Sequence, residues 1–80
     1  MKLKVRFFAR YREALGVDSI AVEGDFATID DVRALLAQRD GAEVLREQNL
    51  MCARNEELCQ LDEPVVDGDE VAFFPTVTGG

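Results

Sequence analysis

The sequence has no histidine and a single serine, Ser19, so the usual general base and hydroxyl nucleophile are nearly missing. Two cysteines, Cys52 and Cys59, are too few for a disulfide scaffold, and their spacing matches no zinc or iron–sulfur pattern. We expect both to pack as small apolar residues. No apolar run approaches the roughly 18 residues of a membrane span. The acidic groups near Asp62 and Asp67 are better explained by turns than by metal binding. These absences predict no metal site, no bound cofactor and no membrane contact.

Basic residues are also scarce, since nine lysines and arginines face 16 acidic residues and leave a net charge of −7. That balance argues against nucleic acid as a partner. The start of the chain alternates polar and apolar residues instead of building a signal peptide, so we expect a cytoplasmic protein. Residues 1–13 nevertheless form a basic segment with a single acid, Glu13. This segment is either a solvated face or a patch that meets a partner.

What is present begins with a strand. The 80 residues suffice for one domain with one modest core. Strict alternation predicts a strand over 2–8, followed by a short helical turn over 10–15 that Gly16 ends and by a second strand over 19–23. The buried face of the first strand would consist of Leu3, Val5 and Phe7.

One principal helix is expected to begin at Thr28, which has Asp31 in capping-box position, and to end at Asp40-Gly41. The apolar stripe that covers the sheet would consist of Ile29, Val32, Leu35 and Leu36. A shorter helical piece is predicted over 42–48, with Val44 and Leu45 available for burial. Short strands are predicted over 50–54 and 58–61, joined near Asn55, which tolerates positive φ, and a last strand over 70–74. This order predicts an α+β, β-grasp fold with a mixed sheet of about five strands on one main helix.

The end of the chain predicts a flexible arm. Pro75 has no backbone N–H, so the sheet should stop there, leaving a domain over 1–74 and an extended tail over 75–80 that reaches roughly 20 Å. Gly79 and Gly80 lack a Cβ and suit a channel too narrow for side chains. Two glycines alone also occur in ordinary flexible ends. By elimination, however, the carboxylate of Gly80 is the most reactive group present. Adenylation and attack by a sulfur nucleophile would make the chain a carrier.

Two motifs carry a resemblance: Phe7-Phe8-Ala9 followed by Arg12-Glu13, and residues 67–75 running into Val77-Thr78-Gly79-Gly80. On these residues the chain resembles the small subunits of molybdopterin synthase, which are ubiquitin-like sulfur carriers. The resemblance implies that an E1-like enzyme adenylates Gly80 and that the product becomes a thiocarboxylate. It also implies that the tail enters a large subunit, where two sulfurs are added to cyclic pyranopterin monophosphate. Catalytic side chains would belong to that subunit, in a heterotetramer of two small and two large chains.

A docking patch is expected at the root of the tail. Phe8 and Phe74 each point away from the core face of their strands, and the first and last strands of a β-grasp sheet are neighbours, so the two rings should meet in solvent. Leu58 would extend this patch. Together with the resemblance, this predicts the following partner-binding residues: Phe8, Arg12, Leu58, Phe74, Pro75, Thr76, Val77 and Thr78.

Two other functions remain open at this point. A sulfur carrier for thiamine or cysteine synthesis would share the fold and Gly79-Gly80, and a protein modifier would form an isopeptide bond through Gly80. The long Phe-Phe-Pro-Thr-Val-Thr approach to the glycines favours the molybdopterin role. Arg54 and Cys59 stand where the resemblance leads us to expect plain apolar residues.

Overall fold

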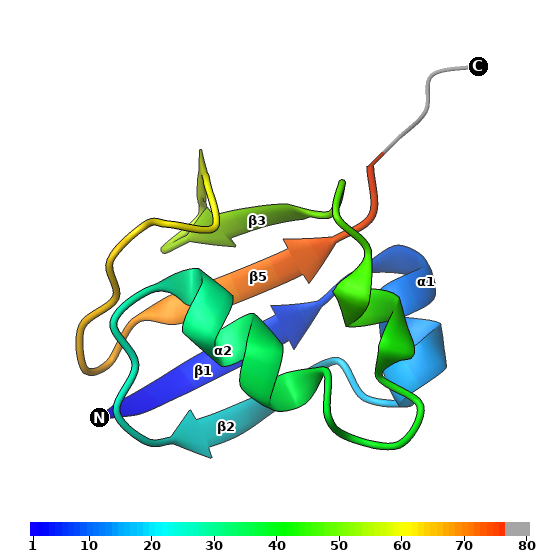
Figure 1. Cartoon of the computed structure of the whole chain (residues 1–80), viewed down its shortest axis with the longest axis horizontal. Helices are drawn as coiled ribbons and strands as arrows, with labels where there is room; N and C mark the ends of the chain where they lie inside the picture. The colour runs from blue at the N-terminus through cyan, green and yellow to red at the C-terminus, as the bar shows by residue number, and fades with distance from the viewer. Residues whose placement is uncertain (77–80) are drawn as a thin grey trace.

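Five strands form one mixed sheet in the order β2-β1-β5-β3-β4, and the computed structural model describes residues 1–76 (Figure 1). Strands β1 and β5 are parallel, and the other neighbouring strands are antiparallel. The strands are β1 (Lys2–Phe7), β2 (Ser19–Glu23), β3 (Met51–Arg54), β4 (Glu57–Cys59) and β5 (Glu70–Phe74). The helices are α1 (Ala9–Leu15), α2 (Ile29–Leu36) and the 3₁₀ turn η1 (Glu43–Arg46). The predicted β-grasp arrangement is confirmed.

The core lies between α2 and one face of the sheet (Figure 1). On β1 the alternation places Leu3, Val5 and Phe7 in the core, each at most 1% exposed, as predicted. Each such side chain contributes about 1.5–3 kcal/mol on burial. On β5 the same alternation buries Val71 and Phe73. The residues that alternate with these on both strands therefore point to the other face of the sheet, which we call the outer face.

Helix α2 begins as predicted but differs in one buried position and in its end. The capping box forms, and the Asp31 carboxylate accepts hydrogen bonds from the backbone N–H of Thr28 at 3.2 Å and of Ala27 at 2.8 Å. The prediction for Leu35 was wrong, because this side chain is 42% exposed. It stands about 100° around the helix from Leu36, which is fully buried. The helix also ends at Leu36, before the predicted Asp40-Gly41.

Other boundaries also differ from the prediction, among them starts that are shifted by one residue in α1, β3 and β4. The first strand ends at Phe7, since Phe8 is the N-cap of α1 and Ala9 turns the chain with a positive φ of 54°. The piece over 42–48 is the 3₁₀ turn η1, in which Leu45 is buried and Val44 half-buried. Strand β4 ends at Cys59 because the following residues form a turn, closed by a hydrogen bond from the N–H of Glu63 to the carbonyl of Gln60.

The β3–β4 hairpin turns on two residues with left-handed backbone. Asn55 has φ 49°, as its residue type predicts, and Glu56 has φ 71°. Two consecutive positive φ angles are typical of a type I′ turn, whose twist matches that of the flanking strands. Glutamate is a poor residue for the second position, because its Cβ crowds the backbone there.

We therefore expect Glu56→Gly to stabilise the protein by about 0.5–1 kcal/mol, since glycine removes this crowding. Urea denaturation followed by circular dichroism measures the change. Glu57→Gly is the matched control, because Glu57 lies in β4, where glycine should destabilise the strand. A lower unfolding free energy for Glu56→Gly than for the wild type would contradict this reading of the turn.

Candidate functional site

The outer face of the sheet is built by strand register. Ala72 lies opposite Arg6 on β1 and opposite Ala53 on β3, and Ala53 in turn lies opposite Leu58 on β4. Side chains at directly opposed positions share a face. The central part of this face is therefore apolar.

Two phenylalanines form the centre of the site. The rings of Phe8 and Phe74 meet edge to face, with centroids 6.3 Å apart and an interplanar angle of 84°. Both side chains are half-buried, so the predicted adjacency is confirmed, whereas full exposure is not. The Arg6 guanidinium lies 5.1 Å from the centroid of Phe8 and 3.7 Å from the carboxylate of Glu70. A cation over the ring stabilises its position and adds charge to the rim of the aromatic pair.

The chain leaves the sheet beside this pair. Strand β5 ends at Phe74, directly before Pro75, as predicted. The hydroxyl of Thr76 donates a hydrogen bond to the carbonyl oxygen of Asn49, so the chain is attached to the body at least that far. The expectation that everything after Pro75 hangs free is therefore wrong at Thr76. The predicted site residues Val77, Thr78, Gly79 and Gly80 lie outside the described residues.

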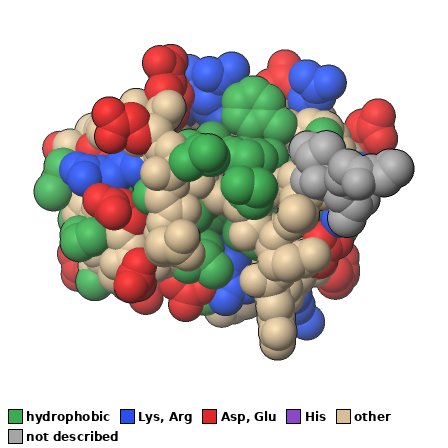
Figure 2. Space-filling model, turned by 90° about the horizontal axis from the view of Figure 1, so that it is seen from above, with side chains coloured by type: hydrophobic (Ala, Val, Ile, Leu, Met, Phe, Trp, Pro, Cys, Tyr) green, Lys and Arg blue, Asp and Glu red, His purple; other side chains and the backbone are tan. Residues whose placement is uncertain are grey.

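Leu58 and Met51 extend the apolar area. Leu58 is 67% exposed and faces the same side as Ala53, so the register settles its orientation as the docking prediction requires. Met51 lies opposite Phe74, is 36% exposed and belongs to the same face. It was not predicted from the sequence. Alternation would have indicated it, because its neighbour Cys52 is buried. Figure 2 shows hydrophobic side chains gathered on the upper side of the molecule, with charged side chains around them. We call Phe8, Met51, Leu58 and Phe74 the outer-face patch.

Arg12 is placed differently from the rest of the predicted site. It lies on α1 and is exposed, and its Nε lies 3.6 Å from a carboxylate oxygen of Asp18. Arg10, on the same helix, forms two hydrogen bonds with Glu47, at 2.5 and 2.6 Å. The hydroxyl of Tyr11 donates to the same carboxylate at 3.0 Å. The arginines of the basic segment are thus paired with acids of the chain itself.

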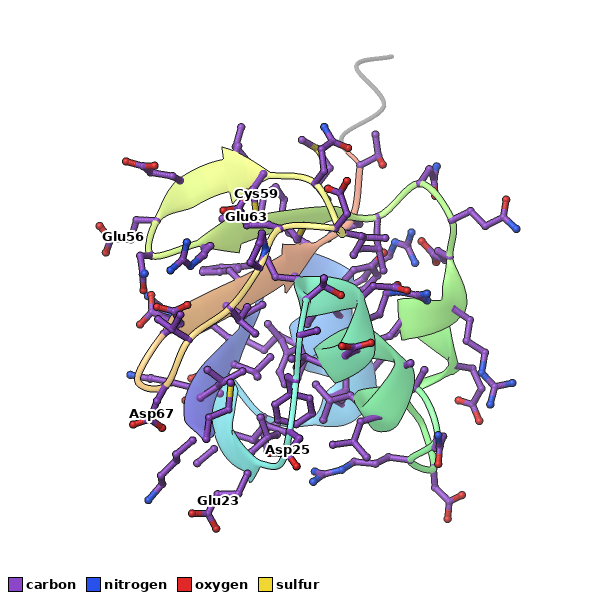
Figure 3. The ribbon with its side chains drawn as sticks, turned by 60° about the vertical axis from the view of Figure 1, so that its left-hand side comes forward. Glu23, Asp25, Glu56, Cys59, Glu63 and Asp67 are labelled. Atoms are coloured by element: carbon purple, nitrogen blue, oxygen red, sulfur yellow. The ribbon has the colours of Figure 1, made fainter. Side chains whose placement is uncertain are left out.

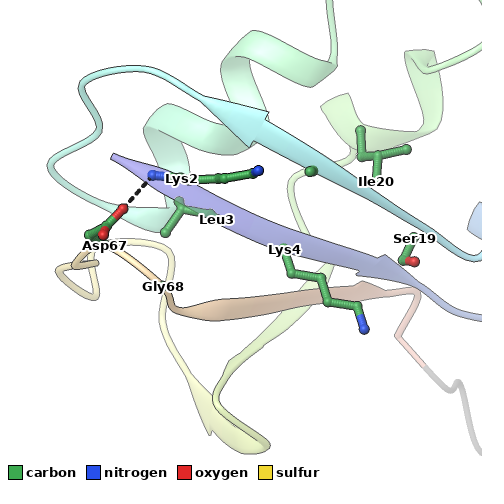
Figure 4. Close-up of a pocket in the computed structure, with 8 residues that line it drawn as sticks. Lys2, Leu3, Lys4, Ser19, Ile20, Asp67 and Gly68 are labelled. Carbon is green, nitrogen blue, oxygen red and sulfur yellow. Dashed lines mark hydrogen bonds between the residues drawn. The ribbon is translucent and has the colours of Figure 1, made fainter.

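The two lysines of that segment line a shallow hollow on β1 and β2 (Figure 4). Lys2 and Lys4 line it together with Ser19 of β2 and Asp67. The carboxylate of Asp67 accepts a hydrogen bond of 2.6 Å from the backbone N–H of Lys2. This hydrogen bond holds the loop before β5 against the start of β1, so Asp67 has a structural role.

Arg54, which looked out of place in the sequence, satisfies a buried carboxylate. Its Nε donates to Asp69 at 2.7 Å, and Asp69 is only 5% exposed. Asp69 also accepts hydrogen bonds from the side chain of Asn55 and the backbone of Val66. Burial alone would raise the pKa of Asp69, but these hydrogen bonds outweigh it and hold the pKa below its ordinary value. Arg54 therefore has a structural role. Its presence where an apolar residue was expected leaves the outer-face patch intact.

Cys52 and Cys59 lie on the core side of β3 and β4, with sulfur atoms 3.9 Å apart. Burial raises the pKa of Cys52 to about 12, and burial also raises the pKa of Cys59. Both are thiols at neutral pH, which agrees with a packing role and not with a catalytic nucleophile. Residues 1–76 contain no cluster of three or more potential metal ligands and no helix long and apolar enough to cross a membrane.

If the two thiols only pack, replacing Cys52 and Cys59 together by alanine should lower the unfolding free energy by about 1–2 kcal/mol, because small buried groups are lost. Sulfur transfer should stay at the wild-type level. A thermal melt and a sulfur-transfer assay on the same preparation measure the two effects. Loss of transfer in a folded double variant would show that a carrier thiol had been overlooked.

The sheet order and the single main helix define a ubiquitin-like β-grasp protein. A model of the ThiS family matches residues 5–80, and the chain belongs to this family. It is 50% identical to the molybdopterin synthase sulfur carrier subunit of Haemophilus influenzae and 48% identical to that of Escherichia coli. In both cases the alignment covers 98% of this chain and 99% of the relative.

Two further similarities bear on function. The chain is 37% identical to small archaeal modifier protein 3 of Haloferax volcanii, with both proteins covered in full. The solved complex of subunits 1 and 2 of molybdopterin-converting factor from Helicobacter pylori contains a chain of the same fold, at a TM-score of 0.72 and 27% identity over the whole of both chains. Proteins similar to this chain are therefore named for two different uses of this fold.

Proposed function

We propose that this protein is the sulfur carrier subunit of a molybdopterin synthase and that it acts in the cytoplasm. The observation that carries the proposal is the place where β5 ends, at Phe74 in the outer-face patch, with Val77-Thr78-Gly79-Gly80 a few residues beyond. Identity of 50% to a sulfur carrier subunit over nearly the whole length of both chains supports it. A partner that holds the patch would receive the end of the chain in a defined direction.

In this proposal the chemistry takes place at the carboxylate of Gly80. An E1-like enzyme transfers AMP from ATP to this carboxylate and releases pyrophosphate. A sulfur nucleophile then displaces AMP and leaves a thiocarboxylate. The large subunit takes up the tail and transfers sulfur to cyclic pyranopterin monophosphate, so that two donations complete the dithiolene of molybdopterin. The chain itself contributes an activated terminus and supplies no catalytic side chain.

In this proposal the domain and the tail have different roles. The domain over 1–74 docks through Phe8, Leu58 and Phe74, while the tail over 75–80 reaches the reaction centre. Arg12 would contribute at the edge of the interface, since it is exposed on α1 beyond Phe8. Pro75 and Thr76 begin the tail, and the hydrogen bond from Thr76 to Asn49 would fix the direction in which it starts. The assembled synthase would contain two small and two large subunits.

The activation step can be tested on the protein alone. We expect incubation with ATP, sulfide and a purified E1-like enzyme of molybdenum cofactor synthesis to replace one oxygen of Gly80 by sulfur. Intact-mass spectrometry detects this change, and fragmentation assigns it to the last residue. Omission of ATP is the control and should leave the mass unchanged. An unmodified terminus after complete incubation would contradict the proposal.

A protein modifier is the second candidate, and the similarity to the archaeal modifier favours it. The same adenylate at Gly80 would then be attacked by a lysine amine of a target and form an isopeptide bond. Trypsin digestion of proteins from a cell that expresses the tagged chain would leave a Gly-Gly remnant on target lysines. A carrier for thiamine or cysteine synthesis would differ only in the molecule that accepts the sulfur.

A further inference from the structure

Cys52 and Cys59 lie directly opposite each other on the antiparallel strands β3 and β4. Their sulfur atoms are 3.9 Å apart, and the thiol of Cys52 donates a weak hydrogen bond to the carbonyl of Cys59 at 3.4 Å. Directly opposed residues of an antiparallel pair have Cα atoms about 4.5–5.5 Å apart. This spacing lies within the range of about 4.4–6.8 Å that a disulfide spans. The two thiols can therefore be joined without moving the strands.

The two cysteines differ in exposure. Cys52 is 2% exposed, whereas Cys59 is half-buried. Cys59 borders a hollow of about 310 Å³ at the β4 edge of the sheet. Figure 3 shows Cys59 beside Glu63 in the upper middle of the view. The other residues that line this hollow are Arg54, Asn55, Glu57, Leu58 and Glu63.

We propose that Cys52 and Cys59 form a redox-active pair that a low-molecular-weight disulfide oxidises to a reversible cross-strand disulfide. In the first step the thiolate of Cys59 attacks one sulfur of the reagent, forms a mixed disulfide and releases one thiolate. In the second step the sulfur of Cys52 attacks Cys59 and releases the second thiolate. The two protons lost by the cysteines end on the two released thiols. The pair is oxidised by two electrons and the reagent is reduced by two.

The geometry favours the second step over reaction of the mixed disulfide with another molecule from solution. Cys52 is held 3.9 Å from Cys59 by the hairpin, so its attack is intramolecular, whereas a second reagent molecule must diffuse in. The raised pKa of Cys59 makes the first step slow at neutral pH, and a mildly alkaline buffer speeds it. Leu58, the neighbour of Cys59 on β4, points to the outer face and also lines the hollow, whereas Cys52 and Cys59 lie on the core side of their strands.

The test uses the full chain without activation of Gly80, so its result is independent of the proposed function. The protein is incubated with glutathione disulfide at pH 8.5, quenched with acid and examined by intact-mass spectrometry. We expect the wild type to lose the mass of two hydrogens and to regain it with dithiothreitol. Cys52→Ala should stop at a stable glutathione adduct on Cys59. Cys59→Ala should react at least roughly tenfold more slowly than the wild type, because a buried thiol is inert.

Three results would overturn the proposal. The first is a wild type that keeps its mass under native conditions but reacts when unfolded in urea. The second is a wild type that stops at the glutathione adduct, because Cys52 then fails to resolve it. The third is equal reactivity of the two single variants, because access through Cys59 would then be wrong. Thermal melts of both variants establish that each is folded at the assay temperature.

Discussion

Deletion of Gly80 is expected to abolish sulfur transfer while leaving the melting temperature nearly unchanged. The terminal carboxylate is the only group to which the proposal gives a chemical step, and a chain that ends at Gly79 places its carboxylate about 3.5 Å short. The core does not depend on it, since the buried residues within 1–76 all precede Phe74. Molybdopterin formation with the large subunit and a thermal melt measure the two effects.

Gly80→Ala is the matched control for this deletion, because it keeps the length and the carboxylate but adds a Cβ. We expect it to lose part of the activity if the channel of the partner is narrow, and to fold as the wild type does. A Gly80 deletion that still yields molybdopterin would contradict the role of the terminal residue.

Truncation of the aromatic pair should weaken docking. We expect Phe8→Ala or Phe74→Ala to weaken binding to the large subunit by about 1–3 kcal/mol, or roughly 5- to 150-fold in Kd. Fixing the backbone of a residue costs about 1–2 kcal/mol in entropy, so contacts that a partner makes with the tail are largely offset and the outer-face patch must supply net affinity. Isothermal titration with the purified large subunit measures Kd.

Leu35→Ala serves as the matched control for docking. Leu35 is 42% exposed, but it lies on α2, which packs on the opposite side of the sheet from the patch. Its removal should leave Kd unchanged. An unchanged Kd for both phenylalanine variants, or a loss of stability as large as the loss of affinity, would remove Phe8 and Phe74 from the interface.

Much of the fold could be predicted from local patterns. The period-two alternation of Leu3, Val5 and Phe7 defines a core face for β1, and the spacing of Thr28 and Asp31 defines the start of α2. The end of α2 could not be predicted, because residues 37–41 continue as turns that depend on packing. Leu35 was misassigned because an apolar residue beside the stripe is indistinguishable by type from one within it.

The site was predictable only in part. Phe8 and Phe74, at the ends of the neighbouring strands β1 and β5, lie together as expected. The half-burial of both rings could not be read from alternation, because the rings cover each other and Arg6 covers Phe8. The partner of Arg54 was also hidden, since Asp69 is distant in sequence and its burial depends on the loop before β5.

Reconstitution tests the central claim most directly. Protein carrying the thiocarboxylate is mixed with the purified large subunit of molybdopterin synthase and cyclic pyranopterin monophosphate, and molybdopterin is measured by fluorescence after oxidation. We predict that molybdopterin forms and that the thiocarboxylate at Gly80 reverts to a carboxylate, with two carriers consumed for each product. A thiocarboxylated protein that binds the large subunit and yields no molybdopterin would contradict the proposed function.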